Sequence, residues 1–204
     1  MTRGPKGGMI RWANAAAASG LLCLIVACAT APWARQKPVS VQSHDLFARA
    51  LAAQDAHDEG RAADLLRQLI ALNPKLASAH TNLGVLLARA GRLDEAVVEY
   101  ERAIALVPAD AVAYYNLGLA HRRRGAFAEA EVAYRRALEQ NPSQADAHYN
   151  LGILYELYLN RPSDALVQYR AARDLGIPDA ETVSGWIRGL EQRAAAPQEK
   201  EGTR

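Results

Sequence analysis

The chain has 204 residues, and half of them are hydrophobic, which is enough for one domain with a sizeable core and excludes a largely disordered protein. Ala, Leu, Arg and Glu are abundant and runs of β-branched residues are scarce, so the composition predicts an all-α fold. The formal net charge is only +2, which lacks the strong basic field of most nucleic-acid-binding proteins, and we expect no nucleic-acid partner.

The first segment of the chain has the layout of an export signal. Three basic residues and no acidic residue precede Cys28, and an apolar stretch over residues 13–27 comes after them. This stretch is shorter than a confident membrane span, which needs about 20 residues. We therefore expect a signal peptide over residues 1–27, whose removal would take three of the 24 basic residues and leave the 22 acidic ones in slight excess.

The tetrad Ile25-Val26-Ala27-Cys28 ends the apolar stretch and resembles the lipobox of bacterial lipoprotein signal peptides. In that family the cysteine is diacylated, the peptide before it is removed, and the new amino terminus is acylated as well. The resemblance implies lipidation at Cys28 with palmitate-like chains, whereas Cys23 does not fit the motif. Several acyl chains hold a protein at a bilayer far more firmly than one chain. An ordinary signal peptide and an uncleaved inner-membrane anchor are the alternatives.

The residues after the lipobox predict a location and a tether. Ala29 follows Cys28, and the usual inner-membrane retention signal in such lipoproteins is Asp at this position, so the resemblance favours an outer-membrane protein that faces the periplasm. Pro32 and Pro38 interrupt a segment with few core-forming positions. We expect residues 28–42 to form a flexible tether.

The body of the chain contains an internal repeat. The triplet Asn-Leu-Gly recurs at positions 82–84, 116–118 and 150–152, and prolines recur at 74, 108 and 142, all with one constant period. This pattern resembles the tetratricopeptide repeat (TPR), a pair of antiparallel helices, and implies an α-solenoid over residues 43–192. The expected units are a weak repeat over residues 43–76, clear repeats over 77–110, 111–144 and 145–178, a capping helix over 179–192, and a disordered tail over 193–204.

Each residue type at this spacing has a packing reason. Gly84 is small, so the two helices of a hairpin can approach closely, and Tyr100 is expected to fill the gap toward the next hairpin. Gly91 and Gly125 suit the tight turn inside each hairpin. In the third repeat the counterpart of Tyr100 comes one position later than the repeat period predicts. The extra residue falls near residues 160–162 and predicts a slightly remodelled hairpin.

The resemblance also suggests where a partner would bind. In TPR proteins the first helix of each pair lines the concave groove. Asparagines one repeat apart could hold an extended backbone, because an amide both donates and accepts, while tyrosines supply rigid contact area and aliphatic residues an apolar floor. Asparagines that satisfy neighbouring backbone groups are the alternative. Family members that clamp a peptide carboxylate have Lys and Asn at the positions that Thr81 and Val85 occupy here, so we expect this clamp to be absent. The predicted groove residues are Thr81, Asn82, Val85, Arg89, Tyr115, Asn116, Leu119, Arg123, Tyr149, Asn150, Ile153 and Glu156.

Other polar residues favour structural roles. His80 and His148 lie where the family has a bulky aromatic and have no ligand partner at i+3 or i+4, so we interpret them as core residues and expect no metal site. The run from His121 to Arg124 points in several directions on a helix, and Arg123 alone is expected to enter the groove. No catalytic or phosphate-binding motif is present in the sequence, so we expect no enzyme, no cofactor and no small-molecule substrate.

These features together predict a non-catalytic scaffold that is anchored to the bacterial cell envelope and binds segments of other envelope proteins, as TPR lipoproteins of pilus, secretion or cell-wall machinery do. The alternative is a pilotin-like lipoprotein that escorts a secretin or pilus component, of type IV or Flp type, to the outer membrane. The two differ in whether the acyl anchor at Cys28 or the groove performs the task.

Overall fold

The computed structural model describes residues 39–195, which are almost entirely helical. Contacts divide the chain into residues Met1–Gln42 and Ser43–Arg204, and the repeats lie in the second unit. The predicted signal peptide, Cys28, most of the tether and the last nine residues lie outside the described part. No helix among the described residues is both long and apolar enough to cross a membrane.

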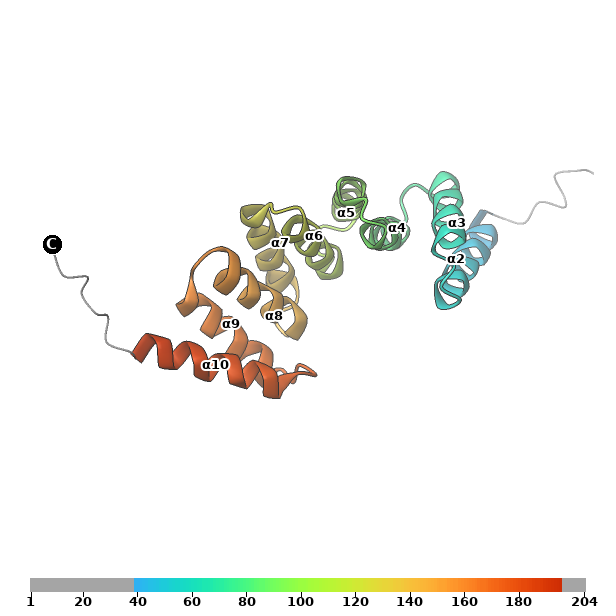
Figure 1. The fold of residues 1–204 in the computed structure, drawn as a ribbon. Coiled ribbons are helices and arrows are strands. Elements are labelled where there is room, and N and C mark those ends of the chain that lie inside the picture. Colours follow the sequence, from blue (N-terminus) through green and yellow to red (C-terminus); the bar gives the residue numbers. More distant parts are fainter. Residues whose placement is uncertain (1–38, 196–204) are drawn as a thin grey trace, which may run out of the picture. The chain divides into compact units, whose positions relative to one another are not determined.

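The described residues form successive helical hairpins, as Figure 1 shows. The helices are α2 (Val39–Asp55), α3 (Glu59–Leu72), α4 (Ala77–Arg89), α5 (Leu93–Leu106), α6 (Ala111–Arg123), α7 (Phe127–Gln140), α8 (Ala145–Ile153) with its continuation η2 (Leu154–Tyr158), α9 (Pro162–Asp174) and α10 (Ala180–Ala195). The all-α superhelix predicted from the sequence is thereby confirmed. Helix α2 begins four residues before the expected repeat region, and α10 runs three residues into the expected tail.

One turn position identifies the weak first repeat as a true hairpin. Gly91 and Gly125 have φ angles of 77° and 78° between their paired helices. His57 lies one repeat period before Gly91 and has a φ of 57°, and Asn160 has a φ of 49° at the corresponding place of the last hairpin. Glycine adopts this left-handed conformation most freely, and asparagine and histidine are among the other residues that adopt it most often, so all four positions suit the same turn.

A glycine and a tyrosine join the two helices of each clear repeat. A Cβ atom added to Gly84 would lie 2.6 Å from the ring of Tyr100, and one added to Gly118 would lie 2.6 Å from the ring of Tyr134. Both rings are almost completely buried. The tyrosines therefore lie on the glycine of their own hairpin. Tyr100 also belongs to one core cluster with Leu117 and Ala120 of the next hairpin, in agreement with the expectation that it fills the gap between the two.

The third hairpin makes the same contact although it has one residue more. Gly152 would also meet the ring of Tyr169 at 2.6 Å if it carried a Cβ. The extra residue is absorbed where α8 widens into the π-helical segment η2, in which the Leu159 N–H donates to the Leu154 carbonyl, five residues back, at 3.1 Å. A π-bulge is the usual way for a helix to accommodate an insertion. The expected remodelling is present and begins before residue 160, inside the first helix.

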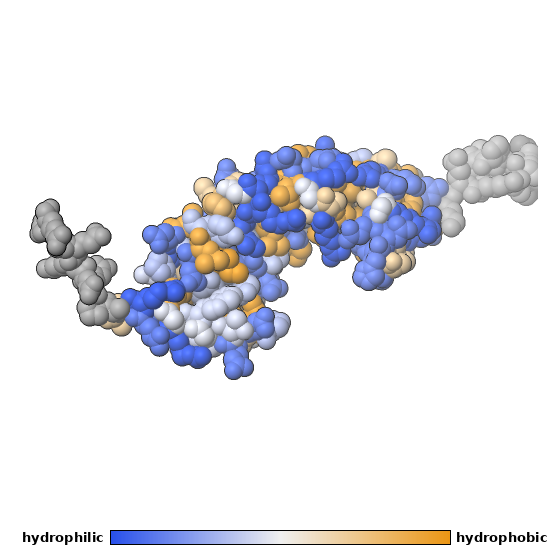
Figure 2. All heavy atoms as spheres, viewed as in Figure 1, coloured by the Kyte–Doolittle hydropathy of each residue, from blue (hydrophilic) through white to orange (hydrophobic). Residues whose placement is uncertain are grey.

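The last helix covers the end of the repeat stack. Val183, Ile187 and Leu190 are buried in one core cluster with Leu154 and Tyr169 of the third repeat. A repeat buries one face on each neighbour, so the terminal one needs such a cover. On the face of the molecule in Figure 2, hydrophilic residues predominate between smaller hydrophobic patches.

Candidate peptide-binding surface

The predicted groove residues lie on the first helices of successive hairpins, α4, α6 and α8 with η2. We call this set of twelve residues the ladder surface. Arg89 and Arg123 are exposed, Thr81 and Asn150 are buried, and the remaining eight are half-buried. The surface is continuous, because members on α6 and on α8 each bond to the first helix of the preceding repeat.

The three asparagines of the ladder surface all bond to their own helix. The side-chain Nδ2 groups of Asn82, Asn116 and Asn150 donate to the carbonyl oxygens four residues earlier, at 2.7, 2.9 and 2.9 Å. This is the local role that the sequence offered as the alternative to ligand binding. It uses one donor of each amide, and an amide has a second donor and an acceptor oxygen for other partners.

Polar contacts cross from repeat to repeat along this surface. Arg123 of α6 donates at 2.7 Å to the Ala88 carbonyl in the last turn of α4, which also accepts from the Gly91 N–H at 3.1 Å. Asn150 of α8 donates to the Tyr115 hydroxyl of α6 at 3.2 Å. These bonds join α4 to α6 and α6 to α8, and they help to fix the positions of the ladder-surface side chains relative to one another.

Helix α10 occupies the last part of the ladder surface. The Trp186 ring stacks on the Tyr149 ring, with centroids 5.8 Å apart and an interplanar angle of 16°. Glu156 accepts hydrogen bonds from Arg193 of α10 at 2.6 Å and from the Tyr169 hydroxyl at 3.0 Å. Tyr149 and Glu156 thus already have partners within the chain, and the less engaged members of the ladder surface lie on α4 and α6.

Two residues of this region were not predicted from the sequence. Arg122 donates to the Asn150 Oδ1 atom at 3.3 Å, so it also reaches the next first helix. Trp186 follows Pro178 by eight residues, the same offset by which Asn150 follows Pro142. This offset was the available signal that α10 contributes a residue at the asparagine position. The fourth member of the His121–Arg124 run, Arg124, forms an ion pair with Asp94 at 2.7 Å.

The tyrosines along this surface have altered acidities. Burial raises the pKa of Tyr115, the Asp146 carboxylate raises it further, and the Arg122 guanidinium opposes both effects. Burial raises the pKa of Tyr134 to about 12, and Arg122 again opposes the shift. Burial also raises the pKa of Tyr149, with Asp179 adding to the shift and Arg122 reducing it. One arginine therefore acts on all three hydroxyls.

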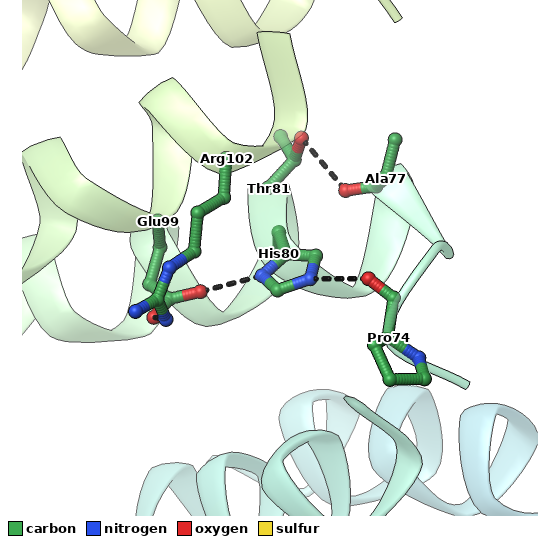
Figure 3. Close-up of polar contacts among 6 residues, drawn as sticks. All are labelled: Pro74, Ala77, His80, Thr81, Glu99 and Arg102. Atoms are coloured by element: carbon green, nitrogen blue, oxygen red, sulfur yellow. Dashed lines mark hydrogen bonds and ion pairs between the residues drawn. The ribbon is translucent and has the colours of Figure 1, made fainter. Parts of the chain in front are cut away.

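The histidine of the first clear repeat belongs to a polar cluster that Figure 3 shows. His80 contacts the Glu99 carboxylate through Nδ1 at 2.6 Å and donates through Nε2 to the Pro74 carbonyl at 3.1 Å. Arg102 donates to the other oxygen of Glu99 at 2.6 Å. His80 is 4 % exposed. The cluster ties both helices of the hairpin to the end of the preceding repeat, as the predicted core role requires.

The third repeat contains a neutral version of this cluster. His148 contacts the Gln168 Oε1 atom at 2.7 Å and donates to the Pro142 carbonyl at 3.1 Å. In the second repeat the corresponding residues are Tyr114 and Ala133, which cannot form it. Among residues 39–195, no group of three or more His, Asp or Glu side chains is placed to hold a metal ion.

The repeats match known sequence families. Models described as TPR repeat and tetratricopeptide repeat match residues 86–125 and 111–144, and a third, also described as tetratricopeptide repeat, matches residues 65–98 and 133–167. The described repeats therefore form a tetratricopeptide-repeat superhelix, a fold that binds other proteins. No curated protein sequence is significantly similar to this one.

Solved structures share the fold at low sequence identity. The Pseudomonas aeruginosa protein pilF is 20 % identical with a TM-score of 0.68, over 78 % of this chain and 71 % of that one. Desulfovibrio magneticus MamA is 21 % identical with a TM-score of 0.57, over 76 % and 78 % of the two chains. Thermobaculum terrenum O-GlcNAc transferase is 23 % identical with a TM-score of 0.62, over 69 % of this chain. The match spans only 26 % of the transferase, so it concerns the helical repeats of a larger enzyme.

Proposed function

We propose that this protein is a non-catalytic scaffold that is anchored to the bacterial envelope and binds segments of other envelope proteins on its ladder surface. The observation that carries the proposal is the continuous row of half-buried side chains on successive first helices, joined by bonds such as Asn150 to Tyr115. Such a row presents polar and apolar groups at regular intervals, which suits an extended or helical segment with its own regular side chains.

The binding surface is tested with substitutions that leave the core intact. Asn116 and Leu119 are half-buried on α6, whereas Val98 and Val132 are exposed on the second helices of two repeats. Changing the first pair to Ala should abolish capture of the partner by the membrane-bound protein, and changing the second pair to Ala should not. Helicity should be unchanged in both, whereas the first pair should lower the melting temperature modestly because Leu119 packs against the core, so capture is measured well below both melting temperatures. Equal capture by the two double variants would assign binding to another surface.

The envelope anchor rests on the sequence of the lipobox alone. We propose that Cys28 is lipidated after removal of residues 1–27 and that Ala29 directs the protein to the outer membrane, facing the periplasm. Mass spectrometry of the mature amino terminus tests this, with Cys28→Ser as the variant and Cys23→Ser as its control. An intact first residue would contradict the lipid anchor and favour the uncleaved inner-membrane anchor, and a cleaved chain without acyl mass would contradict it and favour an ordinary signal peptide.

The pilotin-like function is the second proposal, and it makes a different prediction about Cys28. A pilotin carries its partner to the outer membrane, so Cys28→Ser should misplace the partner as well as the protein. A scaffold that meets its partner in the envelope should leave the partner in place. The similarity to pilF is one of fold, so fractionation of the partner in the Cys28→Ser strain decides between the two.

A further inference from the structure

Arg122 differs from the other arginines of the described region. It is half-buried, and no carboxylate of a described residue lies within 4.0 Å of its guanidinium. The other arginines without such a partner, Arg61, Arg123 and Arg188, are exposed, and the half-buried Arg173 pairs with Asp174 at 2.8 Å. Burial of a cation is unfavourable unless an anion or several hydrogen bonds compensate it. Arg122 is therefore an incompletely compensated cation.

The surroundings of Arg122 offer it few hydrogen bonds. A guanidinium has five N–H donors, and among the described side chains Arg122 bonds only to the neutral amide oxygen of Asn150, at 3.3 Å. Its Nε atom is buried without a partner. The Tyr134 hydroxyl, on a side chain that is completely buried, lies close enough to Arg122 for the guanidinium to oppose the rise of its pKa, but a neutral hydroxyl does not compensate the positive charge.

The ladder surface around Arg122 carries uncompensated positive charge. Its next neighbour, Arg123, bonds to a backbone carbonyl and has no carboxylate of a described residue within 4.0 Å. The acidic member of the ladder surface, Glu156, is already paired with Arg193. Asp146 acts on the Tyr115 hydroxyl, but it forms no ion pair with Arg122. The charge that this surface lacks is negative, and a carboxylate is the group that a guanidinium binds best, through two parallel hydrogen bonds.

We propose that Arg122, which bonds to Asn150 of the ladder surface, is a subsite beside this surface for an acidic side chain, and that the bound partner presents a Glu- or Asp-rich segment to α6. This inference rests on the proposed function, because it names the chemistry of the segment that the surface binds. The carboxylate reaches the part of the Arg122 guanidinium that meets solvent. Tyr115 adds a hydroxyl that accepts from Asn150 and so keeps its own proton to donate.

The test uses the full chain and a fluorescein-labelled hexaglutamate peptide, with hexaglutamine as the uncharged match, in fluorescence polarisation. Hexaglutamate should bind at least about tenfold more tightly than hexaglutamine, and R122Q should remove that preference. The control is R124Q, which removes one positive charge from a nearby position of the same run, where Arg124 pairs with Asp94. It should change hexaglutamate binding less than about twofold, as expected for an exposed pair.

Several results would overturn this assignment. Equal binding of hexaglutamate and hexaglutamine would exclude recognition of negative charge. Equal losses of hexaglutamate affinity in R122Q and R124Q would show general electrostatic attraction and no specific subsite. If R122Q does not fold, judged by its circular dichroism and melting, R122K decides, because it keeps the charge but loses the paired donors. Unchanged binding in R122K would contradict the subsite. Binding of anionic phosphatidylglycerol vesicles that R122Q abolishes would assign Arg122 to lipid instead. If hexaglutamate does not bind but the partner is still captured, the acidic subsite is wrong and the proposed scaffold function is unaffected.

Discussion

The α6–α7 hairpin and the α8–α9 hairpin make the same contact from different sequences. The interval from Gly152 to Tyr169 is one residue longer than the interval from Gly118 to Tyr134. In both hairpins a Cβ on the glycine would lie 2.6 Å from the tyrosine ring. Helix α6 of the α6–α7 hairpin is a regular α-helix, whereas α8 of the α8–α9 hairpin continues into the π-helical segment η2. The packing contact is thus preserved, and the backbone between the two residues adapts to it.

The largest expected effect comes from a pair of deletion variants, one that lacks a residue of η2 and one that lacks the corresponding residue of α6. Leu157 lies in η2 and is 67 % exposed, so its deletion should convert the π-turn into a regular α-helical turn and restore the spacing of the other repeats. The shortened protein should fold and melt within a few degrees of the parent. Circular dichroism during thermal and urea unfolding measures both properties.

The matched deletion is that of Arg123, the corresponding residue of α6. Removing one residue from a regular helix rotates the chain beyond it by about 100°, so Gly118 and Tyr134 could no longer meet without a rearrangement. We expect a loss of more than about 3 kcal/mol in unfolding free energy. Equal losses for the two deletions would show that η2 does not serve to absorb the extra residue.

The next effect separates tight helix contacts from open ones with a single substitution. Gly118→Ala places a methyl group against the buried Tyr134 ring and should cost about 1–3 kcal/mol of unfolding free energy. Gly189→Ala in α10 meets nothing within 4 Å, so it should stabilise the protein by about 0.5–1 kcal/mol through helix propensity. Changes of the same sign at both glycines would contradict the packing difference between the two positions.

A smaller effect distinguishes the hydroxyls of two equivalent tyrosines. The Tyr169 hydroxyl donates to Glu156 at 3.0 Å, whereas the Tyr134 hydroxyl is buried without a hydrogen bond. Tyr169→Phe should cost about 1–2 kcal/mol, because a bond to a charged group is lost. Tyr134→Phe should be neutral or slightly stabilising, since no bond is broken. The two free energies from denaturant titrations test this difference, and a large loss at Tyr134 would refute it.

The smallest effect concerns the turn that all the hairpins share. His57 adopts a φ of 57° in the first hairpin, where the next two hairpins have glycine. His57→Gly removes a steric cost of about 1–2 kcal/mol but increases the entropy of the unfolded chain, so we expect a net gain of at most about 1 kcal/mol. Gly91→Ala should lose about 1 kcal/mol for the same steric reason. Thermal melts of the two variants should shift in opposite directions.

The fold could be predicted because its main determinants are local and periodic. The Asn-Leu-Gly triplets and the prolines mark each hairpin, and Gly91 and Gly125 mark its turn. The site of the π-turn could not be located, since the sequence shows that one residue is extra but the fit of Tyr169 on Gly152 decides where it is absorbed. Likewise, His57 does not mark its turn in the sequence as the glycines do, because most histidines have a negative φ.

The ladder surface was predictable in position but not in detail. The repeat register placed its residues on the first helices, and the structure agrees. Which of them remain open depends on contacts between distant segments. Tyr149 is covered by Trp186, and Glu156 is paired with Arg193, both from α10. The missing carboxylate partner of Arg122 is also a property of the assembled repeats, because a sequence does not show which charges meet.

Photo-crosslinking from the ladder surface in the envelope-bound protein is the decisive experiment for the scaffold function. A photoreactive amino acid is placed at Asn116 on α6 in one variant and at Val132 on α7 in another, and both are irradiated in intact native cells. An envelope scaffold that binds on its ladder surface should give one adduct of defined mass from position 116, sensitive to Cys28→Ser, and none from position 132. An adduct from position 132 alone, or the same adduct from both positions, would contradict it.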